Sequence, residues 1–168
     1  MPTAQTVDTV HELLARTVEY PTPDLPAQAR ACEAALSGQH GRAARHIARF
    51  RAFVEQAEPG ALEELYTATF DLRPTCYPYI GYQLFGETYK RGEFLALLNA
   101  RYRQAGLAVT GGELPDHLGM ILRYLARTSD ADLVAEGVLP ALERMIEQLQ
   151  DNPYREPLRA ILAVLRDQ

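Results

Sequence analysis

The chain has few cysteines and no long apolar run. Both shortages limit the classes of protein to which it can belong. Cys32 and Cys76 are its only cysteines, and neither belongs to a CxxC motif or to a Cys/His pair with metal-ligand spacing, so we expect neither a disulfide framework nor a zinc site. No stretch approaches about 18 consecutive apolar residues. The N-terminal run MPTAQTVDTVHELLARTVEY lacks the pattern of a signal peptide. We therefore expect a soluble protein of the cytoplasm.

The standard sequence motifs of enzymes are also absent. The chain contains no GxxxxGK[ST] phosphate loop, GxGxxG fingerprint, HExxH zinc motif or GxSxG elbow. Cys76 lies beside Tyr77 without an evident base, which favours a packed thiol over a nucleophile. Cys32 is predicted to be a core residue. We therefore assign no catalytic residue, no metal ligand and no cofactor.

Length, composition and charge indicate an ordinary globular protein. The 168 residues are 47% hydrophobic and 23% charged, which predicts a single folded domain over residues 1–168. The net charge of −5 disfavours a nucleic-acid partner and favours a basic peptide. Arg42, Arg45, Arg49 and Arg51 make one segment locally basic, but no aromatic platform accompanies them. We interpret these arginines as the solvated face of a helix.

Apolar residues recur at three- and four-residue spacings along most of the chain, which predicts helices. The first stripe comprises Val7, Val10, Leu13, Leu14 and Val18, with a helix end near Tyr20 before Pro21 and Pro23. Further helices are predicted from Asp24 to Ser37, around 43–54, from Pro59 to about Leu72, from Ile80 to Gly86, from a Thr88 cap to Gly106, after Pro115, from about Asp130, and around 158–165. No segment shows the period of a strand. The predicted fold is an all-α, single-domain helical bundle of roughly eight to nine helices.

The segment Glu113-Leu-Pro-Asp116-His117 places two carboxylates and a histidine close together on a helix start. Their spacing could present acid–base or metal-binding groups on one face. However, Pro115 is typical of a first helical turn, and acidic groups there accept hydrogen bonds from free backbone N–H groups. The residues by themselves favour helix capping over chemistry.

Aromatic side chains crowd into the middle of the chain. The cluster comprises Tyr66, Phe70, Tyr77, Tyr79, Tyr82, Phe85 and Tyr89. At helical spacings such residues usually pack in a core. Tyrosines flanked by proline and glycine also suit a peptide-binding groove. Both interpretations remain open at this point.

Three blocks of sequence resemble the NarJ branch of the TorD-like chaperones, also known as nitrate reductase delta subunits. The blocks are LEELYTATFDLRPTCYPYIGYQLFGETYKRG, LLNARYRQAGL and ELPDHLGMILRYLA, in this order. The most specific matches are Tyr66 with Phe70-Asp71, Gly86-Glu87 with Lys90-Arg91-Gly92, and Glu113 to Leu118, with Glu19-Tyr20-Pro21 as a further similarity. The segment 74–79 is richer in proline and aromatics than we expect of respiratory nitrate reductase chaperones. This departure leaves open which substrate is used by the enzyme that such a chaperone would assist.

The resemblance implies an all-α protein that is not an enzyme. It implies a cytoplasmic chaperone that binds the apo catalytic subunit of a molybdenum oxidoreductase, such as nitrate reductase, at its N-terminal leader or leader-like segment. Such a chaperone supports insertion of the molybdenum cofactor and assembly of the complex, without a cofactor of its own. We expect a monomer and leave a dimer open. The alternatives are a small helical enzyme or metal-binding protein that uses the ELPDH segment, and a structural subunit of the mature complex.

Together, the aromatic cluster and the ELPDH block predict a client-binding surface. Its candidate residues are Tyr66, Phe70, Asp71, Tyr79, Tyr82, Glu87, Lys90, Arg91, Glu113, Pro115, Asp116 and His117. Asp116 and His117 are expected to be polar anchors beside an apolar groove. Neighbouring carboxylates are expected to raise the pKa of His117 above about 6.5, so that a basic client binds more tightly as the pH rises.

Overall fold

Helical segments account for the regular structure that the computed structural model describes, over residues 8–109 and 111–168. There are nine continuous segments in these ranges: α1 (Thr9–Thr17), α2 (Leu25–Leu36), α3 (Gly41–Gln56), α4 (Pro59–Tyr66) with the π-helical turn η1 (Thr67–Asp71), α5 (Ile80–Phe85), α6 (Tyr89–Gln104), α7 (Leu118–Leu125), α8 (Ala131–Leu133) with η2 (Val134–Val138) and α9 (Leu139–Gln148), and α10 (Arg155–Arg166). The predicted all-α class and helix number are confirmed. Val7, which we placed on the first helix, lies outside the described residues.

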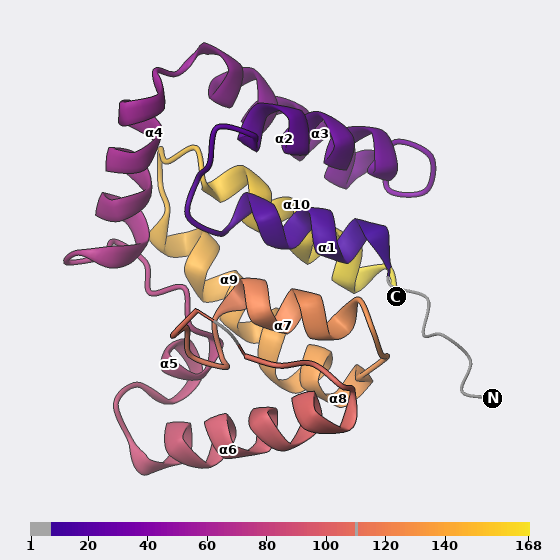
Figure 1. The fold of residues 1–168 in the computed structure, drawn as a ribbon, viewed down its shortest axis with the longest axis vertical. Coiled ribbons are helices and arrows are strands. Elements are labelled where there is room, and N and C mark those ends of the chain that lie inside the picture. The colour runs from indigo at the N-terminus through magenta and orange to yellow at the C-terminus, as the bar shows by residue number, and fades with distance from the viewer. Residues whose placement is uncertain (1–7, 110) are drawn as a thin grey trace.

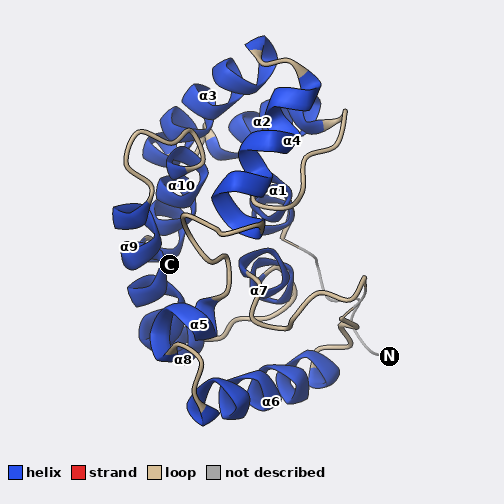
Figure 2. Ribbon diagram, turned by 90° about the vertical axis from the view of Figure 1, so that its left-hand side faces the viewer, coloured by secondary structure: helices blue, strands red, loops and turns tan. Residues whose placement is uncertain are grey.

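The helices stack in tiers (Figure 1). The α2–α3 hairpin forms the upper tier, α1 and α10 lie beneath it, and α7 and α9 follow below, with α6 at the opposite end from α2–α3. Helix α3 packs on both α2 and α10, and α1 packs on both α2 and α7. Figure 2 shows α1 and α7 almost end-on and next to each other. Among the described helices, none has both the length and the apolar character that crossing a bilayer requires.

Part of the aromatic cluster belongs to the core. Tyr66 and Phe70 pack with ring centroids 5.1 Å apart, and each lies edge-on to Tyr154. Tyr154 also contacts Phe50 of α3. These rings join α3, the α4–η1 segment and the start of α10, in addition to the buried apolar stripes that the helical spacing predicted. For these residues the core interpretation of the aromatic run is confirmed.

Two details of the predicted helix ends are wrong. Helix α1 ends at Thr17 rather than near Tyr20, because the ring of Pro21 would clash with the Thr17 carbonyl in a continuing helix. Thr88 occupies the N-cap position of α6, but its side chain does not cap the helix. The Thr88 hydroxyl instead donates a hydrogen bond to the Phe85 carbonyl, 3.0 Å away. Gly106, at φ +72°, follows the end of α6 as predicted.

Two extended segments cross where α5 and α7 begin. The Ile80 N–H donates to the Asp116 carbonyl, and the Leu118 N–H donates to the Pro78 carbonyl, each over 2.9 Å. Tyr79 and His117 thereby form an isolated antiparallel bridge. The crossing places Tyr79 beside His117 although the two are far apart in the sequence.

The Asp116 carboxylate fastens this crossing. It has no exposed surface, and its Oδ2 accepts hydrogen bonds from the Gly81 N–H and from the Arg91 Nε, both at 3.1 Å. The Arg91 Nη2 donates to the Asp116 Oδ1 over 3.2 Å. A Cβ atom at position 81 would lie 2.7 Å from the Asp116 Oδ2, so only glycine fits there. One carboxylate therefore holds α5, α6 and the start of α7 together.

Replacing Asp116 should therefore lower the free energy of unfolding of the protein. We expect Asp116→Asn to lower the free energy of unfolding by about 3 kcal/mol, because it leaves the Arg91 guanidinium largely buried without its counter-charge. Asp71→Asn is the control, since the Asp71 carboxylate is exposed, and it should change the free energy of unfolding by less than about 0.5 kcal/mol. Urea denaturation followed by circular dichroism measures both. Equal stability of the two variants would contradict the role given to Asp116.

Candidate binding cleft

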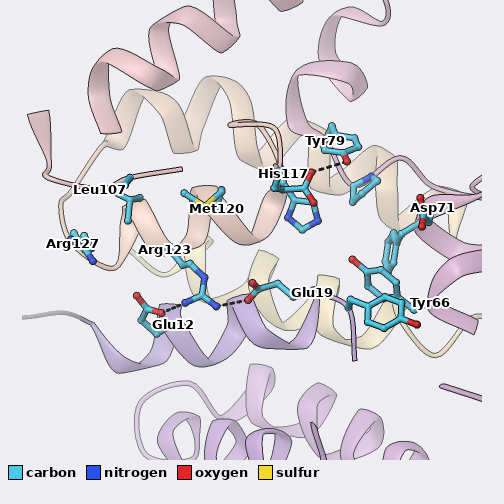
Figure 3. Close-up of a pocket in the computed structure, with 15 residues that line it drawn as sticks. Glu12, Glu19, Tyr66, Asp71, Tyr79, Leu107, His117, Met120, Arg123 and Arg127 are labelled. Carbon is cyan, nitrogen blue, oxygen red and sulfur yellow. Dashed lines mark hydrogen bonds and ion pairs between the residues drawn. The ribbon is translucent and has the colours of Figure 1, made fainter. Parts of the chain in front are cut away.

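A cleft of about 550 Å³ opens between α1 and α7 (Figure 3). Helix α1 and the residues after it form one wall, α7 forms the opposite wall, and η1 and the crossing segments close one end. The lining residues are Glu12, Glu19, Tyr20, Tyr66, Phe70, Asp71, Pro78, Tyr79, Leu107, Ala108, Glu113, His117, Met120, Arg123 and Arg127.

Half of the predicted client-binding residues meet in this cleft. They are Tyr66, Phe70, Asp71, Tyr79, Glu113 and His117. The other half, which do not line the cleft, are Tyr82, Glu87, Lys90, Arg91, Pro115 and Asp116. Asp116 is fully enclosed, so in this structure it holds the crossing segments and offers no surface to a client. Lys90 is exposed in the first turn of α6, and Glu87 is exposed just before this helix.

Aromatic rings form the end of the cleft near η1. The Tyr66 hydroxyl donates to the Val18 carbonyl over 3.1 Å, which ties α4 to the residue after α1. Tyr20 lies edge-on to Tyr66, with centroids 5.5 Å apart, and 53% of its surface is exposed. Tyr20 is therefore the accessible face of this wall, while Tyr66 and Phe70 support it from the core.

Tyr79 is held from three sides. Its hydroxyl donates to the Glu113 Oε1 over 2.8 Å, and its ring lies edge-on to the His117 ring at 5.6 Å. The Arg91 guanidinium lies 5.4 Å from the Tyr79 ring centroid and 5.8 Å from that of Tyr82, within the range of a cation–π contact. Burial and the bond to Glu113 raise the pKa of Tyr79, so the hydroxyl remains a donor.

His117 caps α7 and remains neutral. Its Nδ1 accepts a hydrogen bond from the Gly119 N–H over 3.0 Å, so the proton of the neutral ring lies on Nε2. Burial lowers the pKa of His117 by more than Glu113, Glu19 and Asp116 raise it. The predicted upward shift is wrong, because it counted the neighbouring charges and omitted the loss of water.

The expectation that acidic residues of the ELPDH segment cap the following helix is also wrong. His117 is the cap of α7, whereas the Asp116 carboxylate turns toward Gly81 and Arg91. Glu113 lies before the helix and accepts from the Leu114 N–H over 3.0 Å. The motif is structural, as expected, but each residue has a different task.

The cleft carries more negative than positive charge. Glu12, Glu19, Asp71 and Glu113 contribute carboxylates, against the guanidinium groups of Arg123 and Arg127. Arg123 crosses from α7 to α1, donating from Nη1 to the Glu12 Oε2 over 2.6 Å and from Nη2 to the Glu19 Oε1 over 2.5 Å (Figure 3). Arg127 donates to the Gly106 carbonyl. The surplus of carboxylates suits a cationic ligand.

Several lining residues were missed by the sequence analysis. Glu12 and Tyr20 come from the first wall, whose place opposite α7 no local pattern reveals. Met120 and Arg123 were detectable, because they follow His117 at three-residue steps and so share its helix face.

Both cysteine thiols lie outside the cleft and are buried. Burial raises the pKa of both Cys32 and Cys76 to about 12, which confirms that both are packed thiols. Within residues 8–109 and 111–168 no group of three histidine, cysteine or acidic side chains is arranged to hold a metal ion.

Two assembly chaperones are similar to this chain in sequence. The chain is 34% identical over 113 residues to the probable nitrate reductase molybdenum cofactor assembly chaperone NarJ of Bacillus subtilis, covering 65% of this chain and 61% of that protein. It is 30% identical over 100 residues to the NarJ assembly chaperone of Escherichia coli K12, covering 58% of this chain and 42% of that protein. The alignments thus span less than two thirds of either relative.

A solved structure has the same fold. A putative redox enzyme maturation protein from Archaeoglobus fulgidus superposes with a TM-score of 0.66 at 21% identity, over 93% of this chain and 91% of that one. The family model of the nitrate reductase delta subunit matches residues 33–165, which includes the sequence blocks that carry the predicted resemblance. The chain therefore belongs to the nitrate reductase delta subunit family.

Proposed function

We propose that this protein is a cytoplasmic assembly chaperone that binds the apo catalytic subunit of a molybdenum oxidoreductase and supports insertion of its molybdenum cofactor. The observation that carries the proposal is the aromatic and acidic cleft between α1 and α7, in a chain whose relatives bear the name of molybdenum cofactor assembly chaperones. The cleft is the binding site, and the client's N-terminal segment is its ligand.

The size and chemistry of the cleft fit a short segment of chain. A volume of about 550 Å³ is in the range of ligand pockets and accommodates a few side chains rather than a folded domain. The exposed Tyr20 ring offers apolar contact, and the surplus carboxylates attract cationic side chains. A basic, amphipathic segment therefore fits best. Because such a segment becomes ordered on binding, its affinity is moderate for the surface that it buries.

The enzyme alternative has less support. Asp116 and His117, which gave the ELPDH segment its chemical interest, are both engaged in structural hydrogen bonds. Glu113 is engaged by the Tyr79 hydroxyl. These groups build the cleft and do not form a nucleophile with its base.

Affinity capture distinguishes chaperone from structural subunit. The tagged protein is co-expressed with a molybdenum-enzyme catalytic subunit, in cells that can or cannot make the cofactor. We expect capture of the apo subunit and its release once the cofactor is loaded. Stoichiometric recovery with the mature enzyme would instead identify a structural subunit.

A second prediction tests whether the peptide binds in the cleft or on the neighbouring surface around Tyr82. Tyr79 and Tyr82 both contact Arg91, but only Tyr79 lines the cleft. We expect Tyr79→Ala to weaken binding of a client N-terminal peptide by more than tenfold, as truncation of an aromatic anchor typically does. Tyr82→Ala, the matched control, should change the affinity by less than about threefold. Calorimetry on both folded variants measures this, and the reverse order would move the site to the Arg91–Tyr82 face.

The third prediction concerns pH. Because burial lowers the pKa of His117 from its ordinary value, the ring stays mainly neutral between about pH 7 and pH 8. Peptide affinity should therefore be nearly constant over this window. His117→Asn, which retains an acceptor for the Gly119 N–H, should show the same profile. A loss of affinity toward the acidic end that the wild type shows and His117→Asn lacks would contradict a neutral His117.

A further inference from the structure

We infer that Arg123 is an affinity-tuning residue, which competes with a basic client for the carboxylates of Glu12 and Glu19. The inference rests on the proposed function and adds to it how the cleft limits its affinity for a basic segment. In the free protein, Arg123 occupies both carboxylates. When a client arginine enters, Arg123 yields them to it.

The geometry of the bridge supports exchange. Each terminal nitrogen of Arg123 bonds to a different glutamate, so one planar guanidinium satisfies two acids on the opposite wall. An arginine from a client presents the same planar group and can reproduce both contacts. The guanidinium of Arg123 thus has the chemistry of the ligand that the cleft is proposed to bind.

The bridge is partly exposed to water, which keeps the free-energy cost of exchange small. The side chains of Arg123, Glu12 and Glu19 are 28%, 22% and 36% exposed. Ion pairs that water reaches contribute little net stability. Arg123 can therefore turn toward solvent without leaving a buried, unpaired charge, in contrast to Arg91, whose partner Asp116 has no exposed surface.

The other acids of the cleft are differently engaged. Glu113 accepts hydrogen bonds from the Tyr79 hydroxyl and the Leu114 N–H, and it forms part of the end wall. Glu12 and Glu19 are the cleft carboxylates that a cation of this chain already bridges. A neutral segment cannot replace Arg123 there, because it has no cation to pair with the two glutamates, so it binds with the Arg123 bridge intact. Arg123 therefore lowers the affinity for a basic client and leaves the affinity for a neutral segment unchanged.

Arg127 provides a matched control. It follows Arg123 by four residues and lines the same cleft, but it donates to the Gly106 carbonyl instead of a carboxylate. Removing either arginine makes the cleft more negative by one charge. Only removal of Arg123 also frees Glu12 and Glu19.

The test compares Arg123→Gln with Arg127→Gln in calorimetric titrations of the full chain. The probes are a synthetic amphipathic leucine–arginine peptide and the same peptide with uncharged citrulline in place of every arginine. We expect Arg123→Gln to bind the arginine peptide about fivefold more tightly than Arg127→Gln does, the effect of releasing one partly exposed ion-pair bridge. The two variants should bind the citrulline peptide equally. Arg123→Lys, which cannot span both glutamates, should give an intermediate gain and serves as a second variant if Arg123→Gln is unstable.

Two results would overturn the inference alone: a weaker arginine peptide complex in Arg123→Gln, or equal affinities of the two glutamine variants, while the wild type still prefers arginine over citrulline. A wild-type protein that binds neither peptide, or binds both equally, would instead overturn the proposed recognition of a basic segment and this inference with it.

Discussion

The enclosed ion pair between Asp116 and Arg91 is the constraint on which the cleft depends. It joins the start of α5, the first turn of α6 and the residues before α7 at one carboxylate. Apart from this pair, Tyr79 is kept beside His117 by a single isolated antiparallel bridge and by the contacts of the Tyr79 side chain. A buried pair adds little net stability compared with apolar packing, but it tolerates few other arrangements. Its contribution here is to fix position.

The ELPDH segment has the residue types of a catalytic or metal site in the sequence, but in the structure its polar side chains have structural roles. Asp116 faces inward to Gly81, His117 caps α7, and Glu113 receives the Tyr79 hydroxyl. Three polar residues in five positions are each satisfied by a different partner, two of them from distant segments. Spacing along a helix start indicates which side chains are near one another, but it does not show which way each turns.

Much of the fold followed from the sequence because helical periodicity and proline or glycine boundaries are local properties. The stripe of α3 and the glycine after α6 are examples. The cleft was only half predictable. Its first wall depends on the packing of α1 against α7, which brings together residues more than a hundred positions apart, such as Glu12 and Arg123. The predicted upward shift of the His117 pKa was wrong for a related reason. The charged residues near a histidine can be counted in a sequence, whereas the burial of its side chain cannot.

The Asp116–Arg91 pair and the bridge from Arg123 to Glu12 and Glu19 differ in water access, and this difference separates a structural pair from one that suits the proposed recognition. Asp116 is enclosed, so displacing Arg91 would leave a buried charge without a partner and is unfavourable. Glu12 and Glu19 remain accessible to water, so their bridge to Arg123 can form and break at small cost. The proposed function also requires release of the bound segment. Under the proposed exchange, affinity is limited, because an ion pair that forms between a ligand and Glu12 or Glu19 replaces one that the free protein already has. The proposed complex therefore remains dissociable.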